Sequence, residues 1–314
     1  MVIEGRSPDP SGVLVVDKPG GLTSFAVVRR IGRAAGVKKA GHTGSLDPMA
    51  TGVLPVCLGR ATKLVPYLQA GAKEYEGRLV LGLTTETDDV TGRVTVKKSV
   101  SGLAREEIER AAAEFVGSVW QVPPAYSAIK IEGRPAYALA RRGEKVPARA
   151  RMVVIQNLVL TEVLPPLVSF RVRVSKGTYV RSLVADLGRR LGIGACLESL
   201  RRLASEPFTL AQAVPLTEAE NLARSGRLEE RLVSLEEALS FLPGVNVPEP
   251  MARLVDNGRP LPLSGLEDFT PPAGPVRIQT EGRGLLAIYE YNPSREARGE
   301  CLTPLRVLGR NQSS

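Results

Sequence analysis

Residues 41–55 read GHTGSLDPMATGVLP and combine three glycines, two prolines, the chain's one histidine and a single carboxylate. The segment contains neither a GxxxxGK[ST] phosphate loop nor a GxGxxG turn, so the common nucleotide folds are not supported. Its carboxylate, Asp47, precedes Pro48, which favours extended backbone at Asp47. The glycines permit close approach of another chain. An ordinary Asp-Pro turn would share this pattern, so the pattern alone leaves its chemistry open.

The wider segment 39–60 is too rich in glycine and proline for a regular element, yet it carries few of the charges expected of a loose linker. We therefore expect an ordered, functional loop. Before it, the apolar run 12–16 predicts a buried strand, and a helix follows that Thr23 or Ser24 caps and Gly36 closes. The apolar residues at helical spacing are Phe25, Val28, Ile31 and Ala35.

Downstream, strands and helices are mixed. Segments 75–83 and 93–96 flank a polar turn and predict a strand pair. The Ala- and Glu-rich segment 103–116 predicts an amphipathic helix, and strict alternation over 168–174 predicts a half-buried strand. The pattern of leucines and Val184 over 183–191 predicts a further helix. Two capping boxes, Thr217 to Glu220 and Ser234 to Glu237, predict two short helices.

The texture of the sequence changes after residue 242, where eight prolines occur between positions 243 and 275. Segments 276–280 and 285–289 flank Glu-Gly-Arg-Gly and predict a hairpin. We expect an α+β protein with a mixed, mostly antiparallel sheet. Its domains are predicted as a catalytic domain over 1–242 and a small β-rich domain over 243–314.

Composition limits the chemistry. The chain has 314 residues and a mean hydropathy of −0.03, with no apolar run of bilayer length. The N-terminus lacks the apolar stretch of a secretory signal, so we expect a cytoplasmic protein. One histidine and three dispersed cysteines cannot supply a zinc site or a disulfide framework, so we expect no metal and no cofactor, and catalysis by carboxylates.

The chain is basic, with 42 Lys and Arg against 33 Asp and Glu, a net charge of +9. Positive excess attracts polyanions, and clustering within a folded chain favours nucleic acid over a merely solvated surface. The clustered cations are Arg29, Arg30, Arg33, Lys38 and Lys39; Arg141, Arg142, Lys145, Arg149 and Arg151; and Arg201 and Arg202.

Taken with four other motifs, GHTGSLDPMATGVLPV at 41–56 resembles the catalytic motif of TruB-type tRNA pseudouridine synthases, and the likeness covers nearly the whole chain. The resemblance implies the pseudouridine synthase fold followed by a PUA-like RNA-binding domain. The other motifs, in order, are Lys18–Ser24, Lys73–Gly77 with Leu81–Asp88, Ser175–Arg181, and Leu200–Leu203.

The resemblance implies that uridine is detached from ribose, turned and rejoined through C5, without metal or redox cofactor. Asp47 matches the catalytic aspartate, acting as nucleophile or as a base at the sugar, and Arg181 matches the arginine that holds it. Tyr75 matches the tyrosine that stacks on the flipped base. His42 matches the residue that takes the space of the extruded uridine.

Tyr179 and Leu200 match residues that line the uracil pocket, and Lys18 belongs to the same predicted substrate site with a mainly structural role. The implied partner is the T arm of tRNA, modified at the uridine conventionally numbered 55. The basic segment 125–152 resembles an RNA-clasping insertion, and flipping the base explains the need for phosphate contacts. We expect a monomer with no obligate protein partner, no DNA and no membrane.

Three alternatives remain at this stage. The protein could be a tRNA-binding or tRNA-folding protein without catalysis, although both Asp47 and Arg181 are present. It could be a dyskerin-type synthase that takes its target from a guide RNA. A sugar hydrolase normally needs two opposed carboxylates, and Asp88, Asp89 and Asp186 have no supporting pattern.

Overall fold

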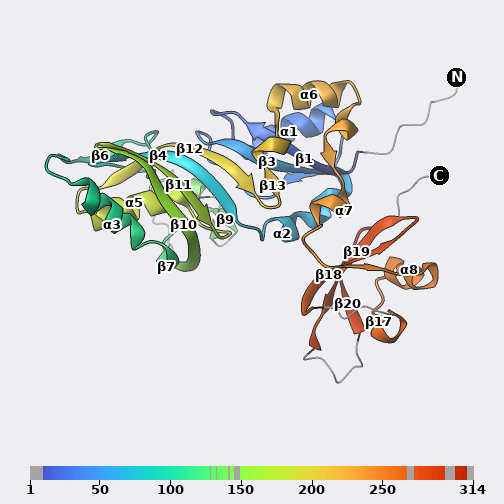
Figure 1. Ribbon diagram of the computed structural model, residues 1–314. Coiled ribbons are helices and arrows are strands. Elements are labelled where there is room, and N and C mark those ends of the chain that lie inside the picture. Colours follow the sequence, from blue (N-terminus) through green and yellow to red (C-terminus); the bar gives the residue numbers. More distant parts are fainter. Residues whose placement is uncertain are drawn as a thin grey trace.

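The computed structural model describes residues 10–127, 129–131, 133–140, 142–144, 149–266, 272–293 and 301–309. Within them, eleven strands form one mixed sheet, with the order β14-β1-β3-β12-β4-β11-β10-β7 and with β2, β13 and β15 at its side (Figure 1). Within this sheet of the described residues, only β1–β14 and β3–β12 pair in parallel. The expected α+β class with a mostly antiparallel sheet is confirmed.

The strands of this sheet are β1 (Gly12–Lys18), β2 (Ala40–His42), β3 (Thr51–Leu58), β4 (Lys73–Leu81), β7 (Gly117–Gln121), β10 (Arg151–Leu164), β11 (Leu167–Val174), β12 (Ala195–Ser205), β13 (Phe208–Thr209), β14 (Val214–Pro215) and β15 (Leu232–Val233). Smaller pairs are β5 (Leu83–Thr85) with β6 (Val94–Lys97), and β8 (Lys130–Ile131) with β9 (Arg134–Pro135). The pairing of β5 with β6 confirms the predicted strand pair.

The helices are α1 (Ser24–Ala34), α2 (Val65–Leu68), α3 (Arg105–Ala113), α4 (Ala136–Ala140), α5 (Val180–Arg190), α6 (Leu216–Arg224), α7 (Leu235–Ala238) and α8 (Glu249–Asp256), and the 3-10 turns cover Gly59–Leu64, Leu210–Gln212, Leu228–Glu230 and Leu263–Gly265. In Figure 1, α3 and α5 lie near the β7 end of the sheet and α1 and α6 near the β1 end.

Alternation explains the main core. On β11 the even positions 168–174 are buried, and they join one apolar cluster with the inner faces of α1, α3 and α5. The predicted alternating strand and the predicted helices around 103–116 and 183–191 are confirmed. Thr23 caps α1 by accepting a hydrogen bond from the Ala26 amide at 3.1 Å, and Ser234 caps α7 in the same way.

The expectation that 39–60 holds no regular element is wrong, because both β2 and β3 lie inside it. β3 is a central strand, and burial between β1 and β12 outweighs the presence of Gly52 and Pro55 in it. Gly52 makes this possible: its φ is +100°, and a Cβ there would lie 2.2 Å from the Arg202 carbonyl oxygen.

Two smaller expectations are also wrong. Phe25 does not join the buried face of α1 but is 66% exposed, since the core-facing positions are Val27, Val28 and Ile31. Thr217 does not cap a helix, because α6 already begins at Leu216, and the partner proposed for it, Glu220, accepts hydrogen bonds from Arg30.

The C-terminal segment forms a separate five-stranded sheet, with its own apolar cluster, that packs on the large sheet through α7 and β19. Its strands are β16 (Gly244–Asn246), β17 (Leu261–Pro262), β18 (Gly274–Thr280), β19 (Gly284–Tyr291) and β20 (Cys301–Val307). Antiparallel pairing of β18 with β19 confirms the predicted hairpin, whereas a domain boundary at residue 243 stays a prediction. No helix in the described part of the chain is long and apolar enough to cross a membrane.

Candidate active site

A bidentate ion pair joins two motifs that are 134 residues apart in the sequence. The Arg181 Nε and Nη2 atoms donate to the two carboxylate oxygens of Asp47 at 2.8 and 2.9 Å. Arg181 lies in the first turn of α5 and is 4% exposed, whereas the Asp47 side chain is 31% exposed. Beside Asp47, the Leu46 backbone both donates to and accepts from the Ser24 hydroxyl at the start of α1. The Asp47 carboxylate is therefore held in place by hydrogen bonds and is still partly exposed to solvent.

Two further N–H groups of Arg181 have partners other than Asp47. Nη1 donates to the Thr87 carbonyl oxygen at 2.8 Å, and Nη2 donates to the Tyr126 carbonyl oxygen at 2.9 Å. The Asp89 carboxylate lies 3.9 Å from Nε and accepts hydrogen bonds from the Thr91 amide and hydroxyl. Sequence reasoning named Asp89 without a supporting pattern, because its contact with Arg181 spans 92 residues. The guanidinium is thus fixed from three segments of the chain.

A fully buried lysine supports the turn that carries Asp47. Lys18 Nζ donates to the carbonyl oxygens of Pro19, Leu22 and Pro48 at 2.8, 2.7 and 3.2 Å. Burial lowers the pKa of Lys18 to about 8, opposed by the negative charge of Asp47. The contact with Pro48 supports the predicted structural role, since Lys18 ties the end of β1 to the residue after Asp47.

A buried arginine also holds the segment that carries Asp47. Arg202 is 1% exposed, and its Nε donates to the Val53 carbonyl oxygen at 2.7 Å. Its Nη2 and Nη1 atoms reach the carbonyl oxygens of Gly44 and Ser45 at 3.1 and 3.5 Å. Sequence reasoning placed Arg202 in a basic cluster and in the Leu200–Leu203 motif, without a role of its own. The motif could have indicated that Arg202 is buried, because it follows Leu200 at the two-residue spacing of one strand face, but its partners could not be predicted from it.

The predicted pocket residues lie on neighbouring elements. Tyr75 on β4 is 8% exposed and stands opposite Arg202 of β12, two positions along from Leu200. Tyr179 precedes α5, its backbone exchanges two hydrogen bonds with the Gln121 side chain, and the Arg151 guanidinium lies 4.9 Å from its ring centre. Among the described residues, only Arg181 forms side-chain hydrogen bonds with the Asp47 carboxylate. Tyr75, Tyr179 and Leu200 are therefore not direct partners of Asp47.

His42 ends β2, five residues before Asp47. Its Nδ1 accepts a hydrogen bond from the Gly44 amide at 3.2 Å. Burial, and then the charge of Arg202, lower the pKa of His42, which favours the neutral ring at neutral pH.

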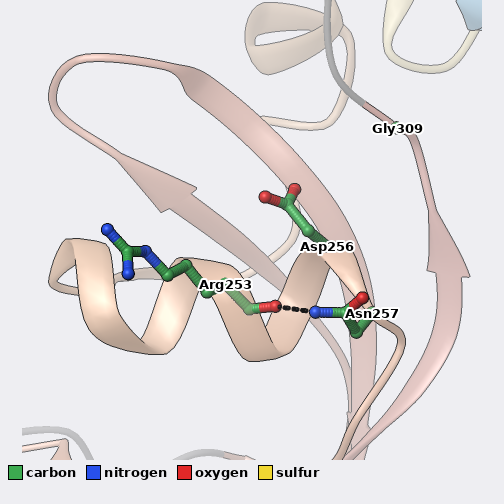
Figure 2. A pocket seen from close by; sticks show the side chains of 4 residues that line it. All are labelled: Arg253, Asp256, Asn257 and Gly309. Atoms are coloured by element: carbon green, nitrogen blue, oxygen red, sulfur yellow. Dashed lines mark hydrogen bonds between the residues drawn. The ribbon is translucent and has the colours of Figure 1, made fainter.

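Two other regions bear on the predicted site. Of the basic insertion, Arg141 and Lys145 lie outside the described residues, and Arg142 lies 3.9 Å from Glu144. Among the described residues, no group of three or more His, Cys, Asp or Glu is placed to hold a metal ion. A pocket of about 400 Å³ lies beside α8, and Figure 2 shows its lining: Arg253, Asp256, Asn257 and Gly309. It contains none of the predicted site residues.

The mixed sheet that carries this ion pair matches the fold of pseudouridine synthase structures. A chain in the structure of an H/ACA RNP bound to a substrate RNA containing 2'-deoxyuridine superposes with a TM-score of 0.73, at 26% identity over 96% of this chain and 86% of that chain. One in a Cbf5-Nop10-Gar1 complex gives 0.74, at 27% identity over 99% and 92%.

Sequence comparison narrows the class. Residues 32–180 match the TruB family pseudouridylate synthase (N terminal domain), and residues 181–240 match the tRNA pseudouridylate synthase B C-terminal domain. The chain is 40% identical to tRNA pseudouridine synthase B of Geobacillus thermodenitrificans, covering 95% of this chain and 99% of the relative. It is 41% identical to that of Syntrophotalea carbinolica, covering 97% and 100%. The chain therefore belongs to the TruB family, whose members are isomerases.

Proposed function

We propose that the protein isomerises uridine to pseudouridine in the T loop of tRNA, at the position conventionally numbered 55. The observation that carries this proposal is the bidentate Asp47–Arg181 pair at a partly exposed position. The N1–C1′ bond breaks, the uracil turns, a C5–C1′ bond forms, and the proton lost from C5 is balanced by one gained at N1. Asp47 acts on the ribose, either as the nucleophile at C1′ or as a base at the sugar.

Arg181 keeps the carboxylate ionised and aimed, because a planar guanidinium fixes both oxygens at once. Tyr75 faces the flipped uracil from β4 and assists loss of the C5 proton. His42, neutral and on the strand before the catalytic turn, occupies the space that the base leaves. Tyr179 and Leu200 bound the uracil pocket. Lys18 acts through the backbone of the Asp47 turn.

Flipping a base costs a few kcal/mol, and contacts to surrounding phosphates offset that cost. The net charge of +9 fits this need. We assign the catalytic domain to residues 1–242, the clasping insertion to about 125–152, and a PUA-like RNA-binding domain to 243–314. The protein acts on the T arm as a monomer in the cytoplasm, without a protein partner or a cofactor.

A guide-RNA-dependent synthase is the second candidate, because the H/ACA RNP and Cbf5-Nop10-Gar1 chains superpose over almost the whole length of this chain. Identity to those chains is 26–27%, against 40–41% to the bacterial tRNA pseudouridine synthases. The stand-alone enzyme is therefore the better supported proposal.

The decisive test is to incubate the purified chain, free of nucleic acid, with an unmodified tRNA transcript and to map pseudouridine by chemical derivatisation and primer extension. The proposal predicts one new pseudouridine, at position 55, and modification of an isolated T-arm hairpin. A product at another position would contradict the assigned site. No product without an added guide RNA would favour the second candidate.

A further inference from the structure

We propose that α1 and the turn after it form a second contact surface for the tRNA backbone, made of Phe25, Arg29, Arg33, Lys38 and Lys39 and named here the α1 ridge. This proposal rests on tRNA as the substrate. It assigns a surface outside the uracil pocket.

Helix geometry places three of the ridge residues, Phe25, Arg29 and Arg33, on one stripe of α1. The buried positions of α1 are Ser24, Val27, Val28, Ile31 and Gly32. At 100° per residue, the outward stripe one turn apart is 25, 29 and 33, which spans ~12 Å. Figure 1 shows α1 against the β1–β3 end of the sheet, with α6 beside it.

On one side of the ridge, α1 contacts β2 and the turn that carries Asp47, the catalytic turn. On the other side it contacts α6. Gly32, which shares the β2 flank of α1, would place a Cβ 3.4 Å from the Ala40 Cβ at the start of β2. At the other end of the helix, Ser24 is bonded to the Leu46 backbone, beside Asp47. The opposite flank is closed, because Arg30 donates to both carboxylate oxygens of Glu220 on α6 at 2.5 and 2.9 Å.

The four cations of the ridge lack anionic partners. Over the described parts of the chain, no carboxylate lies within 4.0 Å of Arg29, Arg33, Lys38 or Lys39, although most other arginines are paired. All four side chains are exposed. Neighbouring like charges repel unless a polyanion neutralises them, and a nucleic-acid backbone offers phosphates along such a stripe.

Phe25 adds a second property to the same surface. Its ring is 66% exposed at the end of the stripe nearest Asp47. An aromatic ring beside cations is the combination used to stack on bases while phosphates are neutralised. The ridge therefore suits RNA better than a protein partner, which would bury apolar area and bring carboxylates.

Positive charge continues beyond the ridge toward the C-terminal sheet. The Lys39 carbonyl oxygen accepts from the Gly59 amide, which places the ridge next to the Gly59–Leu64 turn. Burial, and then the charges of Arg60, Lys39 and Arg306, lower the pKa of Lys63. The ridge thus leads from the catalytic turn to the place where the two sheets meet.

The test measures tRNA affinity against salt concentration in the Asp47→Asn background, so that catalysis does not alter the ligand. Arg29→Gln/Arg33→Gln is compared with Lys97→Gln/Arg110→Gln, a pair of exposed cations on β6 and α3 with the same change in charge. Each lost phosphate contact reduces the slope of log K against log salt by about 0.7–0.9. We expect the ridge variant to lose about 1.4–1.8 in slope and at least about tenfold in affinity near 0.1 M salt, and the control to change little.

Parallel salt lines for the two variants would overturn the ridge proposal. Thermal unfolding is measured on both, and a variant with a lower midpoint is replaced by Lys38→Gln/Lys39→Gln, for which the same slopes are expected. If the wild-type chain modifies tRNA and the ridge variant binds like the control, the ridge fails while the proposed function stands. If wild type neither binds nor modifies tRNA, the proposed function fails first.

Discussion

The arginines around Asp47 and those on the α1 ridge use the same side chain in opposite ways. Arg181 and Arg202 are buried, and each bonds to at least three acceptors, so their positions are fixed before substrate arrives. Arg29 and Arg33 are exposed and unpaired within the described residues. Fixed geometry suits chemistry on one atom, whereas mobile point charges suit a phosphate backbone. Substitutions near Asp47 should therefore lower the reaction rate or the stability, whereas substitutions on the α1 ridge should lower the affinity for tRNA.

Among the substitutions that compare the two arginine regions, Arg181→Lys should have the largest effect. A lysine keeps the charge but cannot bind both Asp47 oxygens together with the Thr87 and Tyr126 carbonyl oxygens. We expect a fall of about 10²-fold or more in the single-turnover rate of tritium release from C5-tritiated tRNA. Arg33→Lys, where a point charge suffices, should leave tRNA affinity within about twofold. Equal effects in the two regions would contradict the comparison.

Arg202→Met should be the next largest effect, seen in stability. The change leaves the carbonyl oxygens of Gly44 and Val53 without their donors, and each buried unsatisfied group costs about 1–3 kcal/mol. We expect the free energy of unfolding, measured with urea, to fall by about 2–4 kcal/mol. Arg201→Met on the same strand, where Arg201 forms a partly exposed pair with Asp17, is the control and should cost about 1 kcal/mol or less.

Lys73 provides a test by pH. Burial lowers its pKa from 10.5 to about 8, so between pH 8 and pH 10.5 the unfolded chain binds more protons at this site than the folded chain. Stability contributed by this group therefore rises with pH across that window, by at most ~1.4 kcal/mol per pH unit. The unfolding free energy of wild type minus that of Lys73→Met should therefore rise from pH 8 to pH 10. A difference that stays flat would show that Lys73 keeps its ordinary pKa.

Phe25→Ala should give the smallest effect. Because the ring is exposed, the unfolding free energy should change by less than about 0.5 kcal/mol. Loss of one stacking contact, worth at least about 1 kcal/mol, should weaken tRNA binding by about fivefold. Unchanged affinity would remove Phe25 from the ridge.

Local patterns predicted much of this structure. Strict alternation predicted β11, and Thr23 followed by helical spacing predicted α1, because both rest on periodicity and capping. The strand β3 was missed, since a glycine and a proline argue against a central strand. The reason it forms is the close contact between Gly52 and the Arg202 backbone, which joins residues 150 positions apart.

Some site residues could be predicted from the sequence, and others could not. Asp47 and Arg181 could be proposed from motif resemblance, and the structure places them in contact. The supports could not be proposed: Asp89, Ser24 and the carbonyl contacts of Arg202 depend on segments that meet only in the fold. The exposure of Phe25 could not be predicted either, because an apolar residue at the edge of a helix stripe can face the core or the solvent.

The measurement that tests the central claim most directly is tritium release from C5-tritiated, unmodified tRNA by wild type and by Asp47→Asn, with tRNA affinity measured in parallel. The isosteric amide keeps the shape of the turn but cannot act as an ionised group. We predict a fall in release rate of about 10³-fold or more with affinity within about threefold of wild type. Release from the Asp47→Asn variant at a rate near that of wild type would contradict the account.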